Sequence, residues 1–298
     1  MIAVDLLGLV YGYVDELLKN PEAEKEELRR RLIERIVENY SRGRELDEKL
    51  RLSRERLESL AAGLALAGFH VFVVDAKLST MGAVGVSHGV LRSVFEVGVS
   101  WDHVLDLPFI PGSSVKGAVR AVAERASRDD ADVLFGRGGD SGWAGLLLFF
   151  DAYPVEAGDR LLEPDIVTPH YSRGGRPVRF EYEVEPVPVA HVSIAPGAVF
   201  RFVVAVEPGG GVLHEEVDRA LANICGRLGV QGGGPASLLL GLLEYALASG
   251  VGARTSQGYG RFEVVSRSAV INGSEHRTPL RVKPARARRG RSTRPGAG

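Results

Sequence analysis

The segment GARTSQGYG at 252–260 holds the residues of this chain whose types and spacing best suit contact with a phosphate chain. Its three glycines allow the backbone to approach a ligand closely, and backbone amides in such loops can bind phosphate oxygens. Arg254 supplies a cation, and Tyr259 supplies a ring on which a base can stack. These are the parts of a contact with single-stranded RNA. An ordinary connecting loop before a strand is the alternative interpretation.

A second glycine-rich segment, GSSVKG at 112–117, follows a proline and opens a predicted helix. It lacks the spacing of a nucleotide-binding P-loop, in which a longer run separates the first glycine from Gly-Lys-Ser/Thr. The start of a helix nevertheless presents unpaired N–H groups and a positive dipole end, and Lys116 lies beside them. The segment predicts an anion contact. The alternative is that Ser113 or Ser114 only caps the helix.

The elements that must position these segments form a mixed α and β pattern. From residue 4 to about 67 the pattern is helical, with breaks at Pro21 and near Gly43. Apolar runs predict buried strands, and a last strand directly follows the glycine-rich residues 252–260; these strands lie at 69–76, 144–154, 198–208 and 261–266. Further helices are expected from 112, over 214–228 and over 237–248. The long connection 155–196 is expected to be functional or disordered.

This order lacks a regular βαβ repeat and suits an α+β, ferredoxin-like domain enlarged by insertions. We therefore expect a helical N-terminal extension at 1–67, a ferredoxin-like domain at 68–270 and a basic disordered tail at 271–298. The tail has no acidic residue after Glu275. Its basic residues are Arg277, Arg281, Lys283, Arg286, Arg288, Arg289, Arg291 and Arg294. Such a segment is attracted to phosphates, although a solvated tail without a partner remains equally open.

The composition narrows the class of protein. The chain is 45% hydrophobic and 25% charged, with a net charge of -1, which is the balance of a soluble protein with a substantial core. No apolar run approaches the length of a membrane span, and the N-terminus is acidic where a signal peptide is basic, so we expect a cytoplasmic location. The single Cys225 excludes an internal disulfide, and no ligand cluster is evident. We therefore expect no metal and no cofactor.

Four segments together resemble the RAMP superfamily of CRISPR-associated proteins. PFIPGSSVKGAVR at 108–120 is similar to its Pro-Gly-Ser-Ser pattern, and GARTSQGYGRF at 252–262 is similar to its C-terminal glycine-rich loop. LFG at 134–136 and LLFFDAYP at 147–154 fit its apolar strand that ends in Asp-Ala. Within the family, DIVTPHY at 165–171 and the Pro-rich segment after it resemble the sixth subunit of the type III-B Cmr effector complex. The resemblance covers residues 69–266.

The resemblance implies a ferredoxin-like (RRM-like) RAMP core and a non-catalytic role. It implies a subunit that caps the helical backbone of the complex and contacts the 3′ part of the guide RNA, while another subunit cuts the target RNA. The implied partners are CRISPR guide RNA, target RNA and other Cmr subunits, with no small-molecule substrate. SRGGRPVR at 172–179 departs from the aromatic residues that often follow in this family, so the role of 171–180 stays open.

The same resemblance assigns site residues by position. The RNA-facing set is Gly252, Arg254, Thr255, Ser256, Gln257, Gly258, Tyr259 and Gly260. The second contact set is Ser113, Ser114 and Lys116. Because phosphate contacts position RNA without reading its bases, we expect low sequence specificity.

Two other functions remain as alternatives. Some RAMP relatives cleave RNA by metal-independent acid-base chemistry, in which a histidine moves a proton. No two histidines here have a spacing that predicts such a pair, and the best candidates for a ribonuclease are His88 and His170. The other alternative is a protein scaffold whose N-terminal helices bind a neighbouring subunit and whose RNA contact is incidental.

Overall fold

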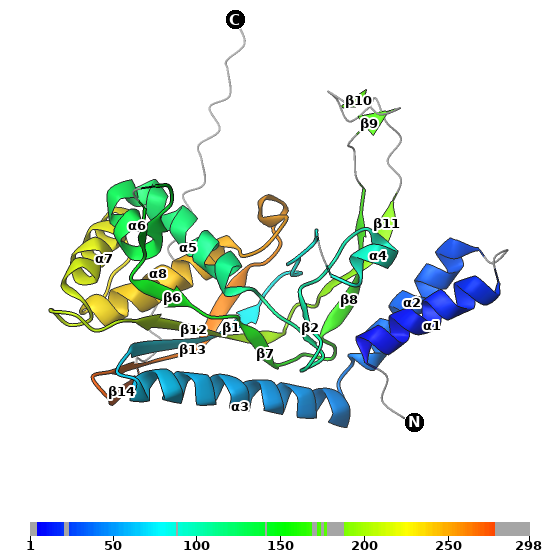
Figure 1. The fold of residues 1–298 in the computed structure, drawn as a ribbon, viewed down its shortest axis with the longest axis horizontal. Coiled ribbons are helices and arrows are strands. Elements are labelled where there is room, and N and C mark those ends of the chain that lie inside the picture. Colours follow the sequence, from blue (N-terminus) through cyan, green and yellow to red (C-terminus); the bar gives the residue numbers. More distant parts are fainter. Residues whose placement is uncertain are drawn as a thin grey trace, which may run out of the picture.

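A five-strand path of antiparallel pairs forms the centre of the computed structural model, which describes residues 5–20, 24–87, 89–140, 142–168, 172–173, 176–177 and 188–277. The strands follow the order β14-β13-β1-β12-β6, and β7 also pairs with β12 (Figure 1). Their bounds are β1 His70–Leu78, β6 Leu147–Phe149, β7 Tyr153–Glu156, β12 Val199–Val206, β13 Phe262–Ile271 and β14 Ser274–Arg277.

Strand β1 lies in the middle of the sheet, between β12 and β13, and it has buried side chains on both faces. Phe72 and Val74 belong to the main core, whereas Val71, which points to the other face, packs in a second cluster with Leu57. A strand buried on both faces needs a nearly continuous apolar run, and β1 has one. The prediction of a buried strand at 69–76 is therefore confirmed.

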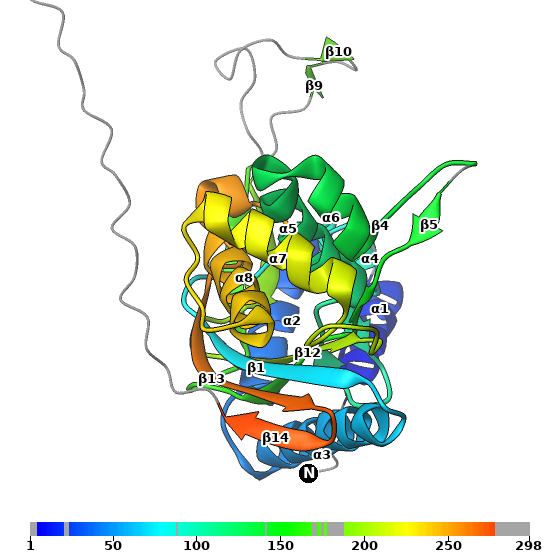
Figure 2. The same cartoon turned by 90° about the vertical axis from the view of Figure 1, so that its left-hand side faces the viewer.

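Helices cover the two faces unequally, as Figures 1 and 2 show. The long helix α3 (Arg44–Leu66) lies along one face. On the opposite side lie α5 (Gly112–Ala126), α7 (Glu215–Leu228) and α8 (Pro235–Ser249), together with the shorter α6 (Arg128–Phe135). Taking β1, β6, β12 and β13 as the core strands, the chain order is β-α-β-β-α-β, with α5 in the first crossover and α7 and α8 in the second. The predicted α+β, ferredoxin-like core is confirmed.

Two details of the sheet differ from the sequence prediction. The strand expected at 144–154 is split into β6 and β7, and between them Ala152 pairs with Ile110 while Asp151 accepts a hydrogen bond from Gly112, the first residue of α5. At the other end, β14 pairs with β13 through Arg277, so the sheet continues beyond residue 271, where we expected the tail to begin. Residues 278–298 of that predicted tail lie outside the described residues.

The N-terminal region is helical, with α1 (Leu6–Lys19), α2 (Lys25–Asn39) and α3 divided near the two predicted breaks. Buried Asp106 ties this region to the core. Its carboxylate accepts hydrogen bonds from Tyr40 at 2.7 Å, Lys49 at 2.8 Å and Trp101 at 3.1 Å. The pKa of the Tyr40 hydroxyl is raised, first by burial and then by the nearby Asp106 charge. The N-terminal helices are thus built into the fold.

A two-stranded ribbon was not foreseen from the sequence. β8 (Leu162–Val167) pairs with β11 (Val189–Ile194), inside the stretch predicted to be a long connection. Pro164 lies within β8, and a proline inside a segment argues against a strand, so the strand was concealed in the sequence. The remaining short elements are α4 Arg92–Phe95, β2 Trp101–Asp102, β3 Leu107–Pro108, β4 Gly136–Arg137, β5 Trp143–Ala144, β9 Ser172–Arg173, β10 Arg176–Pro177 and the 3-10 turn η2 Thr255–Gln257.

The described residues hold neither a candidate membrane span nor a candidate metal cluster. Among them, no helix combines the length and apolar character needed to cross a bilayer. The same residues include no group of three or more His, Cys, Asp or Glu side chains arranged to hold a metal ion.

Candidate nucleic-acid interface

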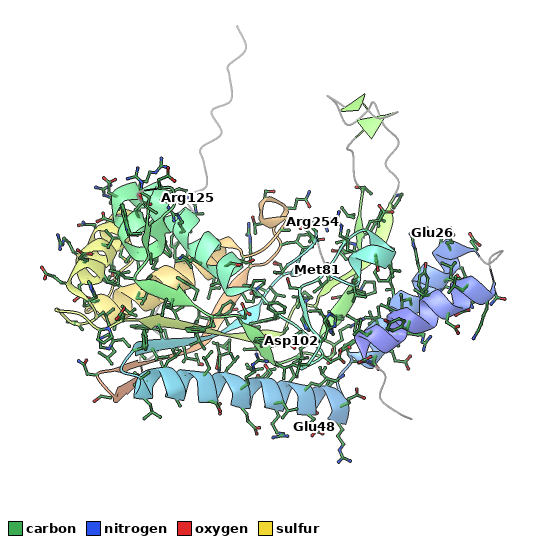
Figure 3. The ribbon with its side chains drawn as sticks, viewed as in Figure 1. Glu26, Glu48, Met81, Asp102, Arg125 and Arg254 are labelled. Carbon is green, nitrogen blue, oxygen red and sulfur yellow. The ribbon has the colours of Figure 1, made fainter. Side chains whose placement is uncertain are left out.

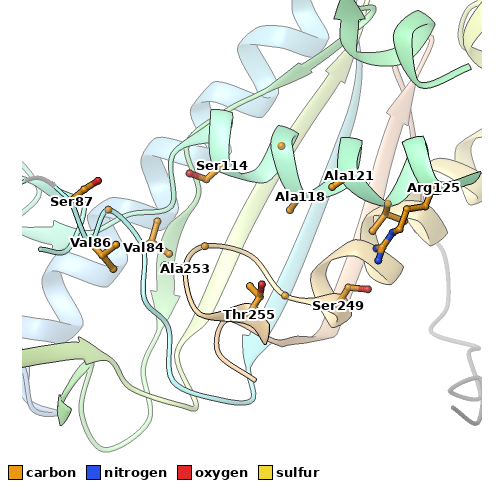
Figure 4. Close-up of a pocket in the computed structure, with 15 residues that line it drawn as sticks. Val84, Val86, Ser87, Ser114, Ala118, Ala121, Arg125, Ser249, Ala253 and Thr255 are labelled. Carbon is orange, nitrogen blue, oxygen red and sulfur yellow. The ribbon is translucent and has the colours of Figure 1, made fainter. Parts of the chain in front are cut away.

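An open groove of about 760 Å³ brings the two glycine-rich segments together. One wall is α5, which contributes Ser114 and Arg125. The other wall is the loop after α8, which contributes Gly252 and Thr255 (Figure 4). The segment 84–87 closes one end. The two motifs, more than a hundred residues apart in the sequence, therefore face one space.

Backbone hydrogen bonds fix the glycine-rich loop, defined here as residues 252–260, against the segment that follows β1. The Ala253 N–H donates to the Ala83 carbonyl at 2.7 Å, and the Gly260 N–H donates to the Met81 carbonyl at 2.8 Å. Gly252 has a φ of 100°, and a Cβ there would lie 2.5 Å from the Ala83 oxygen. Only glycine fits this close approach. Backbone hydrogen bonds thus attach the loop near both of its ends to the segment after β1.

Several amides of the loop remain available to a ligand. The N–H groups of Gly252, Thr255 and Ser256 make no hydrogen bond to a described residue. Thr255 and Gly252 line the groove directly. Successive free amides in a turn form a concave site for an anion. This arrangement supports the expected phosphate contact.

The far side of the loop lines a second, shallower hollow of about 470 Å³. Ser256, Gln257, Gly258 and Tyr259 contribute to it, and so does Arg261. The predicted RNA-facing set is thereby divided between two sides of one loop.

The side chains of Arg254 and Tyr259 are engaged with each other and with Asp165 of β8. The Arg254 guanidinium lies 4.3 Å from the centre of the Tyr259 ring, and its Nη1 lies 3.3 Å from the Asp165 carboxylate. The Tyr259 hydroxyl donates to Asp165 at 3.0 Å. Burial, followed by this hydrogen bond, raises the pKa of Tyr259. One face of the ring that we expected to stack on a base is therefore covered by the arginine.

The start of α5 is organised differently from the sequence expectation. The helix begins at Gly112, with Pro111 before it, and neither Ser113 nor Ser114 makes a capping hydrogen bond. Instead, the Gly112 N–H donates to the Asp151 carboxylate at 2.7 Å. A Cβ on Gly112 would lie 2.5 Å from the Phe149 oxygen, which explains the glycine. A carboxylate therefore already occupies this helix end, and Ser114 lines the groove from the first turn of the helix.

Lys116 faces away from the groove. It lines a separate hollow of about 340 Å³ with Arg137 of β4 and the half-exposed Trp143 of β5. The Arg137 guanidinium lies 5.9 Å from the centre of the Trp143 ring. The second contact set predicted from the sequence is thus split, since Ser114 and Lys116 lie on different sides of α5.

Two functional candidates were missed by the sequence analysis. Arg125 lines the groove and makes no ion pair with a described residue (Figures 3 and 4). Its helical spacing from Ser114, Ala118 and Ala121 could have revealed this, because those positions share a face. Asp165 gave no such signal, because its contacts come from residues about ninety positions away.

The histidines offer limited support for acid-base chemistry. His88 and His170, the candidates for a ribonuclease, lie outside the described residues. His70 and His191 are buried, and burial lowers the pKa of each. His214 accepts a hydrogen bond from the Glu216 N–H at the start of α7. Within the described part of the chain, no histidine lines the groove.

Comparison with known proteins gives relatives of one kind. The chain is 28% identical over 285 residues to "CRISPR system CMR subunit Cmr6" of Saccharolobus solfataricus, covering 88% of this chain and 89% of the relative. A cryo-EM structure of "the Type III-B Cmr-beta bound to cognate target RNA" contains a chain with a TM-score of 0.62 and 28% identity, covering 83% of this chain and 74% of that one. The crystal structure of Cmr6 from Pyrococcus furiosus matches with a TM-score of 0.38 and 20% identity, covering 66% and 98%.

The predicted resemblance to the sixth Cmr subunit is confirmed by these relatives. The sequence model of the RAMP superfamily matches residues 68–263, which include the whole groove, the core strands β1, β6 and β12, and the start of β13. This span is well over half of the chain. The chain belongs to the RAMP superfamily.

Proposed function

We propose that this chain is a non-catalytic RNA-binding subunit of a type III-B CRISPR effector complex. The relatives support the complex, because one is a Cmr subunit and another is a chain of a Cmr assembly bound to target RNA. The observation that carries RNA binding is the groove, which joins Ser114 and Arg125 of α5 to the free amides of the glycine-rich loop.

The lining of the groove suits a sugar-phosphate chain better than a base-specific contact. Gly85, Gly117, Gly250 and Gly252 are among its lining residues, so a backbone can approach closely. Arg125 provides a positive charge at one end, and amides of the loop provide donors on one side. Such contacts fix the path of RNA and carry little sequence information.

The finer parts of the proposal rest on the family resemblance. They are the position at the end of the helical backbone, the contact with the 3′ part of the guide RNA, and partnership with target RNA and other Cmr subunits. Cytoplasmic action is part of the same proposal. In this account the chain holds RNA, and a different subunit cuts it.

The experiment is a binding titration of the purified chain with labelled single-stranded RNA, with cleavage followed on a gel in the same samples. We expect binding without cleavage. We also expect the logarithm of the affinity to fall linearly with the logarithm of salt concentration, because phosphate binding releases counterions.

Other outcomes would favour the alternatives. Metal-independent cleavage that disappears in His88→Ala or His170→Ala would assign a ribonuclease. Absence of binding by the chain alone, together with its stable incorporation into a complex, would favour a protein scaffold.

A further inference from the structure

A buried carboxylate lies where the glycine-rich loop meets the β8–β11 ribbon. The Asp165 side chain is only 8% exposed. Its Oδ2 atom accepts a hydrogen bond from the Ser193 hydroxyl of β11 at 2.8 Å, and Nε2 of His191 lies 3.3 Å from the same oxygen. The backbone N–H of Ile166 donates to Oδ1 at 2.8 Å. These contacts fix the carboxylate firmly in the ribbon.

The same carboxylate holds the loop at two points. Arg254 lies near the start of the glycine-rich loop and is 3.3 Å from Oδ2, while Tyr259 lies near its end and donates at 3.0 Å. Between them, Nε of Arg254 donates to the side chain of Gln257 at 3.0 Å. One buried charge therefore connects both arms of the loop to a strand that is distant in sequence.

Backbone strain at Arg254 indicates why this attachment is needed. Arg254 has a φ of 61°, in the left-handed region that non-glycine residues seldom occupy. Such a residue persists where its surroundings fix it, and strained positions of this kind cluster at functional sites. Here the ion pair with Asp165 and the stacking on Tyr259 fix the side chain. The next residue begins the 3-10 turn that presents the amides of Thr255 and Ser256.

We infer that Asp165 is a positioning residue for RNA binding, which fixes the glycine-rich loop through Arg254 and Tyr259 so that its free amides face the phosphate chain. The inference rests on the proposed function. Asp165 itself contacts no RNA in this account, and it lowers the net positive charge beside the loop. Its benefit is preorganisation, because a loop ordered before binding loses less conformational entropy when the ligand arrives.

For one substitution, the positioning role and a simple charge effect predict opposite changes in RNA affinity. Replacing Asp165 by Asn keeps the shape of the side chain and removes one negative charge next to an RNA site. Electrostatics alone would then strengthen RNA binding. Positioning predicts the opposite, a weakening by about tenfold, which is the change expected when a hydrogen-bonded charged partner is lost.

The test combines two measurements on the full chain, D165N against a matched control, Glu163→Gln. Glu163 lies two residues earlier in β8 and makes no hydrogen bond or ion pair with a described residue of the loop. Hydrogen exchange without RNA should show faster exchange for residues 251–260 in D165N, unchanged exchange in β1 and β13, and neither change in the control. RNA affinity measured on the same samples should fall only in D165N.

A double variant separates the Arg254 contact from a general loss of packing. Arg254→Gly tolerates the left-handed backbone but has no ion pair to lose. Adding D165N to it should change loop exchange by less than D165N does alone. Unchanged loop exchange in D165N, or faster exchange throughout the sheet, would overturn the inference, as would RNA binding that becomes tighter. If the wild-type chain bound no RNA, the proposed function would fail, and the exchange data would still decide whether Asp165 holds the loop.

Discussion

Arg254 combines two properties that are usually separate, a positive charge and a left-handed backbone conformation. Its guanidinium is stacked on Tyr259 and paired with Asp165, so much of its charge is balanced within the protein. From the sequence we expected Arg254 to contact phosphate directly and Tyr259 to stack on a base. In the structure both residues help to fix the loop, which is a role in addition to the two expected contacts with RNA. Those contacts stay predictions.

Two substitutions at Arg254 separate its charge from its conformation. Arg254→Ala and Arg254→Gly remove the same guanidinium, so both should weaken RNA binding. Alanine also pays the steric cost of a positive φ, whereas glycine does not. We therefore expect the glycine variant to bind RNA about fivefold more tightly than the alanine variant, from a difference of about 1 kcal/mol. Equal affinities in a filter-binding or anisotropy titration would show that the backbone conformation at 254 does not matter.

At the scale of single elements, two sides of α5 line two different hollows. Ser114 and Arg125 face the groove, and Lys116 faces the hollow beside Trp143. Helical periodicity alone predicts that residues 114 and 116 diverge, because they are separated by about 200° around a helix. The motif grouped Ser114 and Lys116 because they are close in the sequence, although they lie on different sides of the helix. The sequence therefore predicted the helix, and the structure shows that two members of the predicted contact set lie on different sides of it.

Two strands carry buried histidines that link stability to pH. Burial lowers the pKa of His70 in β1 and of His191 in β11, while the charges of Asp218 and Asp165, respectively, oppose the change. Arg254 further lowers the pKa of His191. A histidine whose pKa is lower in the folded state than in the unfolded state makes its full contribution to stability at pH values above its unfolded pKa. Its contribution is lost as pH falls below that value, because the unfolded chain then binds the proton more readily.

We therefore expect the free energy of unfolding to decrease as pH falls below about 6.5, the ordinary histidine pKa. Each buried histidine adds a slope of up to about 1.4 kcal/mol per pH unit. Denaturant unfolding between pH 7.5 and 5.5 measures it. His70→Gln should flatten the profile, whereas the exposed His103→Gln should leave it unchanged. An unaltered profile in His70→Gln would contradict the assignment.

At the scale of the whole molecule, the sequence predicted the elements better than their contacts. The apolar runs of β1 and β12 and the breaks near Pro21 and Gly43 were visible because burial and helix termination leave local patterns. The β8–β11 ribbon was missed, since Pro164 within β8 argues against a strand. The Asp165 attachment depends on tertiary structure alone. The two glycine-rich motifs were found as motifs, and only the fold shows that they share one groove.

The sheet also places charged residues on two opposite sides of the molecule, a difference that the net charge does not show. Arg125 and Arg254 lie on the side of the sheet opposite α3, whose outer surface carries Glu48 (Figure 3). Arg51, also on α3, is exposed and paired with Glu55 at 2.6 Å. The two faces therefore provide an arginine inside the proposed RNA path and another outside it. A comparison of the two arginines tests the path with the same change of charge.

The most direct test of the account is the salt dependence of RNA binding by Arg125→Ala and Arg51→Ala, measured beside the wild-type chain. Removing a phosphate contact from single-stranded RNA should reduce the slope of log affinity against log salt by about 0.7. The account predicts this reduction, with weaker binding, for Arg125→Ala and no change for Arg51→Ala. If Arg125→Ala retained the wild-type affinity and slope, or if both variants lost them equally, RNA would not follow the groove between α5 and the glycine-rich loop.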